Sequence, residues 1–136
     1  MVLWVGDTFD AAHRLKDCDG KCRHIHGHTW KVEVGFECRP DVSTPALANG
    51  AVVDFNFLKE KVSKVVGRLD HALFLEENDT FMELSGTSIC VFKSAPTVDV
   101  VARSLYKALK SACALDSFDV VKVRLFETPT CFVEVG

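Results

Sequence analysis

The feature that most constrains the fold is the run H-T-W-K-V-E-V-G-F-E-C, residues 28–38, in which two kinds of side chain alternate. One face of this run consists of His28, Trp30, Val32, Val34, Phe36 and Cys38, and the other of Thr29, Lys31, Glu33, Gly35 and Glu37. This alternation predicts an antiparallel strand with one covered face. Residues 4–15 predict a preceding strand, with Phe9, Ala11 and His13 on one face.

Two later segments show the apolar spacing of amphipathic helices. The first begins after Asp54, whose carboxylate can accept hydrogen bonds from the N–H groups of the first turn. Its core-facing stripe consists of Phe55, Leu58, Val62, Val65 and Leu69. The second begins at Thr97 as N-cap, with Asp99 in the first turn, and extends to Cys113. Its stripe consists of Val98, Val101, Ala102, Leu105, Ala108, Leu109 and Ala112.

The remaining segments predict loops and short strands. Residues 39–50 contain two prolines and predict a loop, which is followed by a short strand at 51–53. Residues 76–93 predict a loop and then a strand at I-C-V-F, and residues 119–128 and 131–135 predict two strands that pair across a Pro-Thr turn. The order β-β-β-α-(β)-α-β-β predicts an α+β fold, an antiparallel sheet with two helices on one face. The other face of such a sheet needs cover, which a second subunit could supply.

The composition limits what the 136-residue chain can be. It is 48% hydrophobic and 26% charged, so we expect residues 1–136 to form one globular domain. A net charge of −3 provides no broad basic field for nucleic acid. We find no signal peptide and no run long enough to span a bilayer, which predicts a cytoplasmic protein with no membrane partner. The six cysteines are widely spaced, so most are predicted to be free thiols.

Three of the five histidines lie in the stretch C-R-H-I-H-G-H, residues 22–28. Side chains at His26 and His28 share a strand face, about 6.5–7 Å apart, and can converge on one Zn²⁺. If the first two strands pair as a hairpin, His13 lies across from them as a third ligand. Three neutral imidazoles leave one tetrahedral position open, which is the arrangement of a catalytic metal.

A rival interpretation uses the same stretch differently. Cys18, Cys22, His24 and His26 have a spacing that could form a closed structural zinc site. That site would leave His13 and His28 without a role, and the chain can bury a core without metal. The three-histidine site is therefore favoured, and His24 is expected to be a surface residue.

Two further polar groups are candidates. The carboxylate of Asp70 can orient the adjacent imidazole of His71, although such a pair is also typical of a helix C-terminus. Glu127 is predicted to share a strand face with Val121, Val123 and Leu125, where a carboxylate needs a partner. A guanidine-like heterocycle, such as a pterin ring, could donate two hydrogen bonds to it. Alternatively, Glu127 is an exposed glutamate at the strand end.

Six motifs occur in an order that resembles a known family. F-D-A-A-H-R-L, C-x3-H-G-H, V-V-D-F-x2-L-K, L-D-H, P-T-x-D and a final F-E-T are similar to the 6-pyruvoyl-tetrahydropterin synthase and 6-carboxy-tetrahydropterin synthase family, over nearly the whole chain. The resemblance implies the tunnelling fold, in which antiparallel four-stranded sheets, each with two helices on one face, close into a β-barrel between subunits. It also implies a homohexamer of two stacked trimers, with active sites at subunit interfaces.

The resemblance implies roles for individual residues. His13, His26 and His28 match the zinc ligands, and Cys22 matches the catalytic cysteine. Asp70 and His71 match its proton relay. Substrate-binding matches are Glu127, which anchors the pterin ring, and Thr97 and Asp99 in the P-T-x-D motif, where the family commonly has glutamate in place of the aspartate. The implied substrate is 7,8-dihydroneopterin triphosphate.

The spacing between Cys22 and His26 bears on the product. Three intervening residues are usual in the carboxy-forming branch, which serves queuosine and archaeosine synthesis and releases acetaldehyde and triphosphate. The pyruvoyl-forming branch usually has five. We therefore favour 6-carboxy-tetrahydropterin synthase, with 6-pyruvoyl-tetrahydropterin synthase as the alternative. A zinc-stabilised pterin-binding domain without activity is a further alternative.

Overall fold

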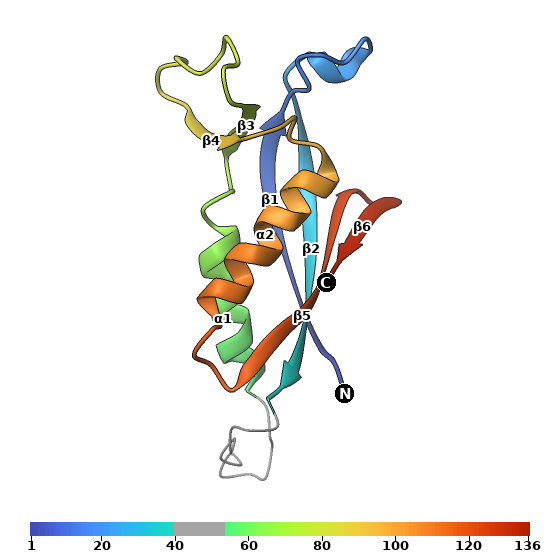
Figure 1. Cartoon of the computed structure of the whole chain (residues 1–136), viewed down its shortest axis with the longest axis vertical. Helices are drawn as coiled ribbons and strands as arrows, with labels where there is room; N and C mark the ends of the chain where they lie inside the picture. Colours follow the sequence, from blue (N-terminus) through green and yellow to red (C-terminus); the bar gives the residue numbers. More distant parts are fainter. Residues whose placement is uncertain (40–53) are drawn as a thin grey trace.

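A computed structural model of the chain describes residues 1–39 and 54–136. Its elements are β1 (Leu3–His13), the short 3₁₀ helix η1 (Lys21–Arg23), β2 (His26–Cys38), α1 (Phe55–Val66), β3 (Ala72–Glu76), β4 (Ser88–Phe92), α2 (Val98–Ala112), β5 (Phe118–Thr128) and β6 (Cys131–Val135). Figure 1 shows the long strands β1, β2 and β5 running along the molecule, with the two helices beside them. The first two predicted strands and both predicted helices are thus confirmed, with boundaries shifted by a few residues.

The described strands form one sheet in the order β4-β3-β1-β2-β5-β6. The pairs β1–β2, β2–β5 and β5–β6 are antiparallel, whereas β3 runs parallel to both β1 and β4. The expected antiparallel four-stranded sheet is therefore wrong in two respects, because the sheet has six strands and its β3–β4 edge is parallel. The predicted I-C-V-F strand lies in β4, and the predicted strand at 51–53 lies outside the described residues.

Strand β3 was not predicted from the sequence. Its residues, A-L-F-L-E, are an unbroken apolar run before the glutamate, and the first four are buried. Parallel strands covered on both sides carry such runs without alternation, so a period of two cannot reveal them. Because β3 was missed, the parallel pairing at this edge of the sheet was not predicted.

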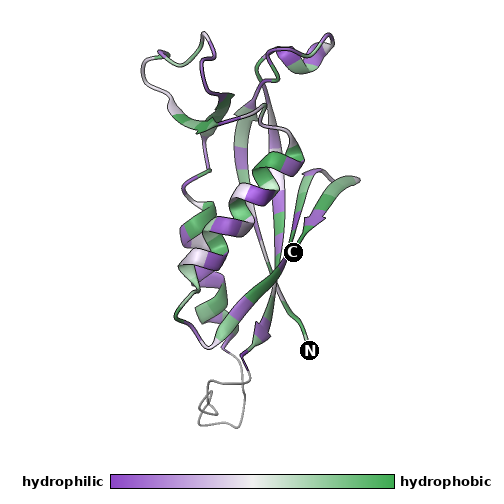
Figure 2. Cartoon of the chain, viewed as in Figure 1, coloured by the Kyte–Doolittle hydropathy of each residue, from purple (hydrophilic) through white to green (hydrophobic). Residues whose placement is uncertain are grey.

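Both helices cover the same face of the sheet, as expected. The strand face predicted from the alternation is confirmed by Trp30, Val32, Val34 and Phe36, none of which is exposed. Buried residues of α1 and α2 complete one core cluster with them: Leu58, Val62, Val65, Val66, Val101, Ala102, Leu105 and Leu109. Figure 2 shows the alternating hydropathy along the strands. None of the described helices has the length and apolar character needed to cross a membrane.

The predicted N-cap of α1 is confirmed, whereas two of its predicted core-facing residues differ from the prediction. Asp54 is the N-cap, and its side chain accepts a hydrogen bond of 2.9 Å from the backbone N–H of Asn56. Phe55 is 45% exposed, so its predicted core position is wrong, and Leu69 lies beyond the end of the helix. Val66 takes a place in the core instead.

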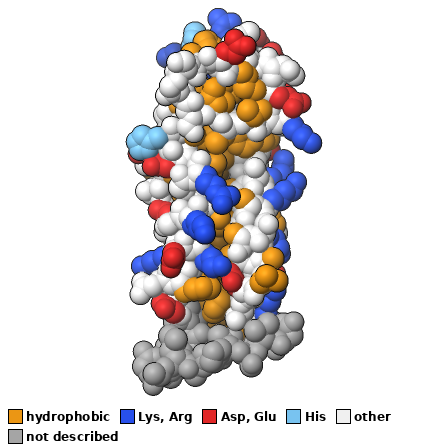
Figure 3. All heavy atoms as spheres, turned by 90° about the vertical axis from the view of Figure 1, so that its left-hand side faces the viewer, with side chains coloured by type: hydrophobic (Ala, Val, Ile, Leu, Met, Phe, Trp, Pro, Cys, Tyr) orange, Lys and Arg blue, Asp and Glu red, His pale blue; other side chains and the backbone are white. Residues whose placement is uncertain are grey.

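Helix α2 differs from its prediction in similar details. Thr97 has the N-cap position and conformation, but its side chain makes no capping hydrogen bond to the backbone. Its hydroxyl donates instead to Asp99 at 2.6 Å. The predicted core residues Ala108 and Ala112 are exposed. They line a groove of about 500 Å³ between α1 and α2, together with Phe57, Lys61, Lys64 and Arg68. Figure 3 shows apolar side chains between basic ones on this side of the molecule.

Strand β5 contains a β-bulge. Gly35 of β2 pairs with Lys122, and the next residue, Phe36, pairs with Val120, so Val121 is an extra residue. A bulge of this kind changes which side chains face the core on either side of it. Val120 is buried before it, and Val123 and Leu125 are buried after it, while Val121 is only half-buried. The predicted face of Glu127 is therefore right for Val123 and Leu125 and wrong for Val121.

The sheet face away from the helices is polar. Glu33 pairs with Lys31 and Arg124, and Glu134 pairs with Lys122 and Arg124. The guanidinium of Arg124 also lies over the ring of Trp4, 4.3 Å from its centroid. This face carries charged side chains that interact with one another rather than a continuous apolar surface.

Candidate active site

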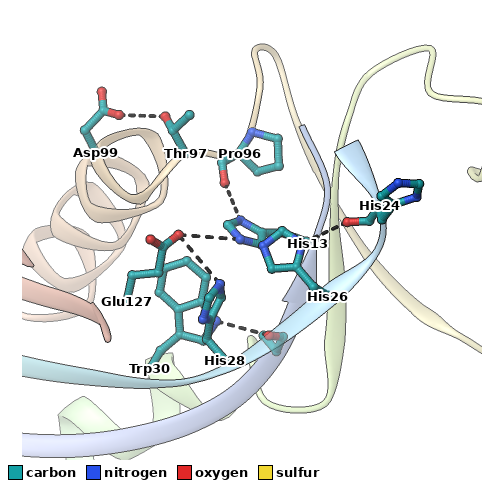
Figure 4. Close-up of polar contacts among 10 residues, drawn as sticks. His13, His24, His26, His28, Trp30, Pro96, Thr97, Asp99 and Glu127 are labelled. Atoms are coloured by element: carbon teal, nitrogen blue, oxygen red, sulfur yellow. Dashed lines mark hydrogen bonds and ion pairs between the residues drawn. The ribbon is translucent and has the colours of Figure 1, made fainter. Parts of the chain in front are cut away.

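The β1–β2 hairpin brings three histidines together. His13 pairs with His26 and Ala11 pairs with His28, so all three imidazoles lie on the helix-covered face at the end of the sheet. Their ligand atoms lie within 4.8 Å of one another, as Figure 4 illustrates. The predicted convergence of these residues is confirmed. The rival set with Cys18, Cys22 and His24 is wrong, because within residues 1–39 and 54–136 only the three-histidine group has this geometry.

Backbone carbonyls orient two of the rings. Nδ1 of His13 donates to the carbonyl oxygen of Pro96 at 2.9 Å, and Nδ1 of His26 donates to that of His24 at 2.8 Å. A carbonyl can only accept, so Nδ1 carries a hydrogen in each ring, and in the neutral ring Nε2 then carries the lone pair. This is the arrangement in which histidine ligates a metal. His24 contributes through its backbone, which agrees with its expected absence from the ligand set.

Two Nε2 nitrogens of the cluster make no hydrogen bond. Nε2 of His13 and Nε2 of His28 are buried and have no hydrogen-bond partner. Burial lowers the pKa of His13 below its ordinary value, which favours the neutral, ligating form. A buried acceptor without a partner costs free energy, and a divalent cation would satisfy all three nitrogens at once. A donor set of three imidazole nitrogens therefore fits zinc.

Glu127 lies beside this cluster. Its Oε1 is 3.5 Å from Nε2 of His13 and 3.9 Å from Nε2 of His28, and the side chain is 28% exposed. The last β2–β5 pair is Lys31 with Phe126, so the two strands part just before Glu127. A groove of about 590 Å³ opens there, lined by Gly27, His28, Thr29, Lys31, Phe126, Glu127, Thr128 and Pro129. The carboxylate is thus available to a molecule that enters beside the imidazoles.

The side chain of Trp30 packs against two rings of the cluster. It is fully buried, and its ring meets those of His13 and His28 edge-on at centroid distances of 5.2 and 5.5 Å. Its indole N–H donates to the carbonyl of Ala11 at 3.2 Å. The alternation placed Trp30 on the face of His28, which was the available signal for this role. Nothing in the sequence indicated the carbonyl of Pro96.

Cys22 lies outside the cluster of three imidazoles. It belongs to η1 and is exposed, and its carbonyl accepts a hydrogen bond of 2.8 Å from the N–H of Leu15. This bond closes the loop between β1 and β2. In the described part of the chain the Cys22 side chain contacts none of the three imidazoles. Cys18, Cys90, Cys113 and Cys131 are, like Cys22, free thiols, and burial raises the pKa of Cys113 to about 11.

The predicted contact between Asp70 and His71 is present. Oδ2 of Asp70 lies 2.9 Å from Nδ1 of His71, whose backbone has a positive φ of 59°. Asp10 holds the pair, because its N–H donates to Asp70 Oδ1 at 2.9 Å and its carbonyl accepts from the N–H of His71 at 2.6 Å. The hydrogen bond from the Asp10 N–H is the main reason that the pKa of Asp70 is lowered.

This pair is separate from the histidine cluster. His71 is 81% exposed and lines a second groove of about 460 Å³ with residues of β1 and β2, among them Asp10, Thr29 and the clustered His28. Within the described residues, neither Asp70 nor His71 makes a hydrogen bond, ion pair or ring contact with the three imidazoles. In a single chain His71 and His28 therefore border the same groove without direct contact.

Thr97 and Asp99 are satisfied locally. Besides the bond from Thr97, Asp99 accepts a hydrogen bond of 3.0 Å from Arg103 one turn later in α2. The bond from Thr97 is the main reason that the pKa of Asp99 is lowered. Figure 4 shows the two side chains at the start of α2, apart from the imidazoles. Their predicted contact with substrate stays a prediction.

Comparison with known proteins identifies the family. The family model described as 6-pyruvoyl tetrahydropterin synthase matches residues 2–136. The chain belongs to this family. Relatives include proteins named 6-carboxy-5,6,7,8-tetrahydropterin synthase from Rickettsia conorii and Haemophilus influenzae, each 31% identical to it. The alignments cover 93% of this chain in both cases, and 94% and 92% of the relatives.

Solved structures agree with this family assignment. The 6-pyruvoyl tetrahydropterin synthase of Caenorhabditis elegans has 28% identity and a TM-score of 0.68, covering 99% of this chain and 94% of that one. A Plasmodium vivax 6-pyruvoyltetrahydropterin synthase mutant, at 20% identity and a TM-score of 0.72, supports the fold alone, with 99% and 96% coverage. Membership of this synthase family and the names of the relatives indicate that the chain is an enzyme, a lyase.

Proposed function

We propose that residues 1–136 form one zinc-dependent 6-carboxy-5,6,7,8-tetrahydropterin synthase domain. It would convert 7,8-dihydroneopterin triphosphate to 6-carboxy-5,6,7,8-tetrahydropterin and release acetaldehyde and triphosphate. The observation that carries this proposal is the set of three converging imidazoles with Glu127 at its edge, in a chain whose relatives are named for this reaction. The product would serve queuosine or archaeosine synthesis in the cytoplasm.

Zinc is the metal we assign to His13, His26 and His28. The three ligands are imidazole nitrogens, and Nε2 of His13 and Nε2 of His28 make no hydrogen bond, which supports zinc over hard cations such as Mg²⁺, which take oxygen ligands. Bound zinc would supply Lewis-acid polarisation of substrate hydroxyls. The carbonyls of Pro96 and His24 would hold two of the rings in the ligating tautomer.

Glu127 is assigned to the pterin ring. Its carboxylate is half-buried and borders the groove between the ends of β2 and β5, where it can accept two hydrogen bonds from the guanidine-like edge of the ring. Fixing the ring there would place the substrate side chain over the imidazoles, which is catalysis by positioning. We assign Thr97 and Asp99 to the rim of the same pocket.

Cys22 is proposed as the general base, with Asp70 and His71 as the proton relay. Within the described residues of one chain, neither Cys22 nor the exposed Asp70–His71 pair contacts the imidazoles, which supports an active site completed by a neighbouring subunit. We therefore propose a homohexamer of two trimers, in which the sheets close into a barrel. In this assembly an Asp70–His71 pair would serve the site of a neighbouring subunit.

The alternative product, 6-pyruvoyl-tetrahydropterin, is favoured by the family description and by the name of the Caenorhabditis elegans structure. The three residues between Cys22 and His26 and the names of the relatives favour the carboxylated product. Incubation of the zinc-loaded protein with 7,8-dihydroneopterin triphosphate and mass spectrometry of the products separates the two. Carboxy-tetrahydropterin with acetaldehyde supports the proposal, pyruvoyl-tetrahydropterin supports the alternative, and recovery of unchanged substrate contradicts both.

A further inference from the structure

A buried ion pair lies directly after the first histidine of the cluster. Nε of Arg14 is 3.1 Å from Oδ2 of Asp79, and the side chains are 17% and 0% exposed. Nε of Arg14 and Oδ2 of Asp79 are in contact as an ion pair, and neither atom makes a hydrogen bond. Each charge is thus compensated by the other, and removing one partner would leave the second buried and alone.

Asp79 is held rigidly by the turn in which it lies. Its Oδ1 accepts a hydrogen bond of 3.0 Å from the N–H of Phe81. Its backbone N–H donates to Glu76 and its carbonyl accepts from Met82, both at 3.2 Å. The ring of Phe81 lies against the guanidinium of Arg14, 4.6 Å from its centroid. The turn after β3 therefore offers a fixed carboxylate and a fixed aromatic ring to one arginine.

The side chains of His13, the last residue of β1, and of Arg14, which follows it, both make contacts to distant segments of the chain. His13 points to the helix-covered face and donates to the carbonyl of Pro96, while Arg14 follows it and reaches Asp79. Strand pairing of β1 ends at His13, which is opposite both His26 and Phe74. Beyond that residue no strand pairing holds the backbone, so the Arg14–Asp79 pair is the next fixed point along the chain.

We propose that Arg14 and Asp79 are positioning residues for the metal ligand His13. By fixing the backbone after His13, they hold its Nε2 where it can share one metal ion with His26 and His28. The inference rests on the proposed metal site, and it adds two residues that act on that site through His13 without touching the metal. Groups that orient metal ligands typically change metal affinity by about 10–100-fold when removed.

The test is the zinc affinity of full-length Asp79→Asn, measured by competition with a chelating dye. We expect a loss of about 10–100-fold relative to the unaltered protein. A thermal melt is recorded in parallel, because losing a buried charge partner also lowers stability. The visible absorption spectrum of the cobalt-loaded variant should change as well, since it reports ligand geometry rather than overall stability.

Asp116→Asn is the matched control. Oδ2 of Asp116 lies 3.2 Å from Nζ of Lys61 and is likewise buried without a hydrogen bond. Asp116 follows the C-terminal end of α2, whereas Pro96 precedes the N-terminal end. This variant should lose stability yet keep the zinc affinity and cobalt spectrum of the unaltered protein. Arg14→Lys provides a milder change, because it keeps the charge and loses the planar guanidinium, and should give an intermediate loss.

The outcomes are distinct. If Asp79→Asn and Arg14→Lys melt at lower temperature but bind zinc as tightly as the unaltered protein, the pair is only structural and the proposal is overturned. If Asp79→Asn fails to fold, the affinity of Arg14→Lys decides in the same way. If the unaltered protein binds no zinc, the metal site under "Proposed function" is wrong, and the positioning role falls with it.

Discussion

The two histidine sites of this chain contrast in how they are built. His13, His26 and His28 lie on paired strands over a buried tryptophan, and backbone carbonyls orient two of their rings. His71 stands at the end of a turn with a positive φ, is 81% exposed and has Asp70 as its side-chain partner. The first site is assembled by one chain. The second makes a close carboxylate–imidazole contact but is exposed, which agrees with the role proposed for it at the site of a neighbouring subunit.

The largest effect should separate these two sites by their metal content. His28→Ala should reduce zinc from about one ion per chain to near zero, because it removes one of three ligands. His71→Ala should retain about one zinc and lower kcat by about 10²–10⁴-fold, the usual contribution of a proton-transferring group. Elemental analysis and steady-state kinetics measure the two quantities. Zinc loss in His71→Ala would remove the distinction.

Cys22→Ala extends the comparison to the loop. We expect it to keep its metal and lose about 10²–10⁴-fold in kcat, since the proposed base is absent. Cys131→Ala is the control, because Cys131 is also an exposed free thiol but lies at the start of β6. Stoichiometric loss of zinc from Cys22→Ala would instead make Cys22 a ligand.

Glu127→Gln should weaken pterin binding with zinc still in place. Losing a charged acceptor costs about 1.5–3 kcal/mol, which corresponds to about 10–100-fold in Kd for neopterin. Fluorescence titration measures this, and Glu134→Gln on the polar sheet face should bind as the unaltered protein does. Equal affinity of Glu127→Gln and the unaltered protein would show that the anchor is a different residue.

The smallest expected effect concerns pH and the metal-free protein. Burial lowers the pKa of His13 in the folded state, so the unfolded chain binds more protons just below the ordinary histidine pKa of about 6.5. Stability should therefore fall as the pH decreases through this region, by a few degrees in the melting temperature. The dependence should be flatter in His13→Gln, as thermal melts with a chelator present would reveal. An unchanged slope would mean that other groups dominate.

The parts of the site that were predictable follow from local periodicity. Alternation placed His13 on the buried face of the first strand and His26 and His28 at the start of the second, and hairpin pairing then required them to meet. The carbonyl of Pro96 contacts His13, and the carboxylate of Asp79 contacts the next residue, Arg14, from segments more than 60 residues away, so no local pattern could indicate them.

Other errors have equally physical causes. An apolar run of four residues is compatible with several structures, so β3 was missed. Helical spacing marks a stripe but not its limits, which is why Phe55 and Ala108 were wrongly assigned to the core. The face of Glu127 was right only because the bulge at Val121 keeps the alternation in step with it.

That bulge has a consequence for how the site could be lost or gained. Counted from the buried Val120 without interruption, the alternation would turn Phe126 toward the imidazoles and Glu127 away from them. The presence of one additional residue, Val121, reverses this choice. Whether Glu127 or Phe126 faces the imidazoles therefore depends on the bulge as well as on the identity of the residues. A register slip that drew Val121 into regular pairing would exchange a carboxylate for a phenyl ring without altering either residue, whereas deletion of Val121 would remove the bulge and leave Glu127 on the imidazole side.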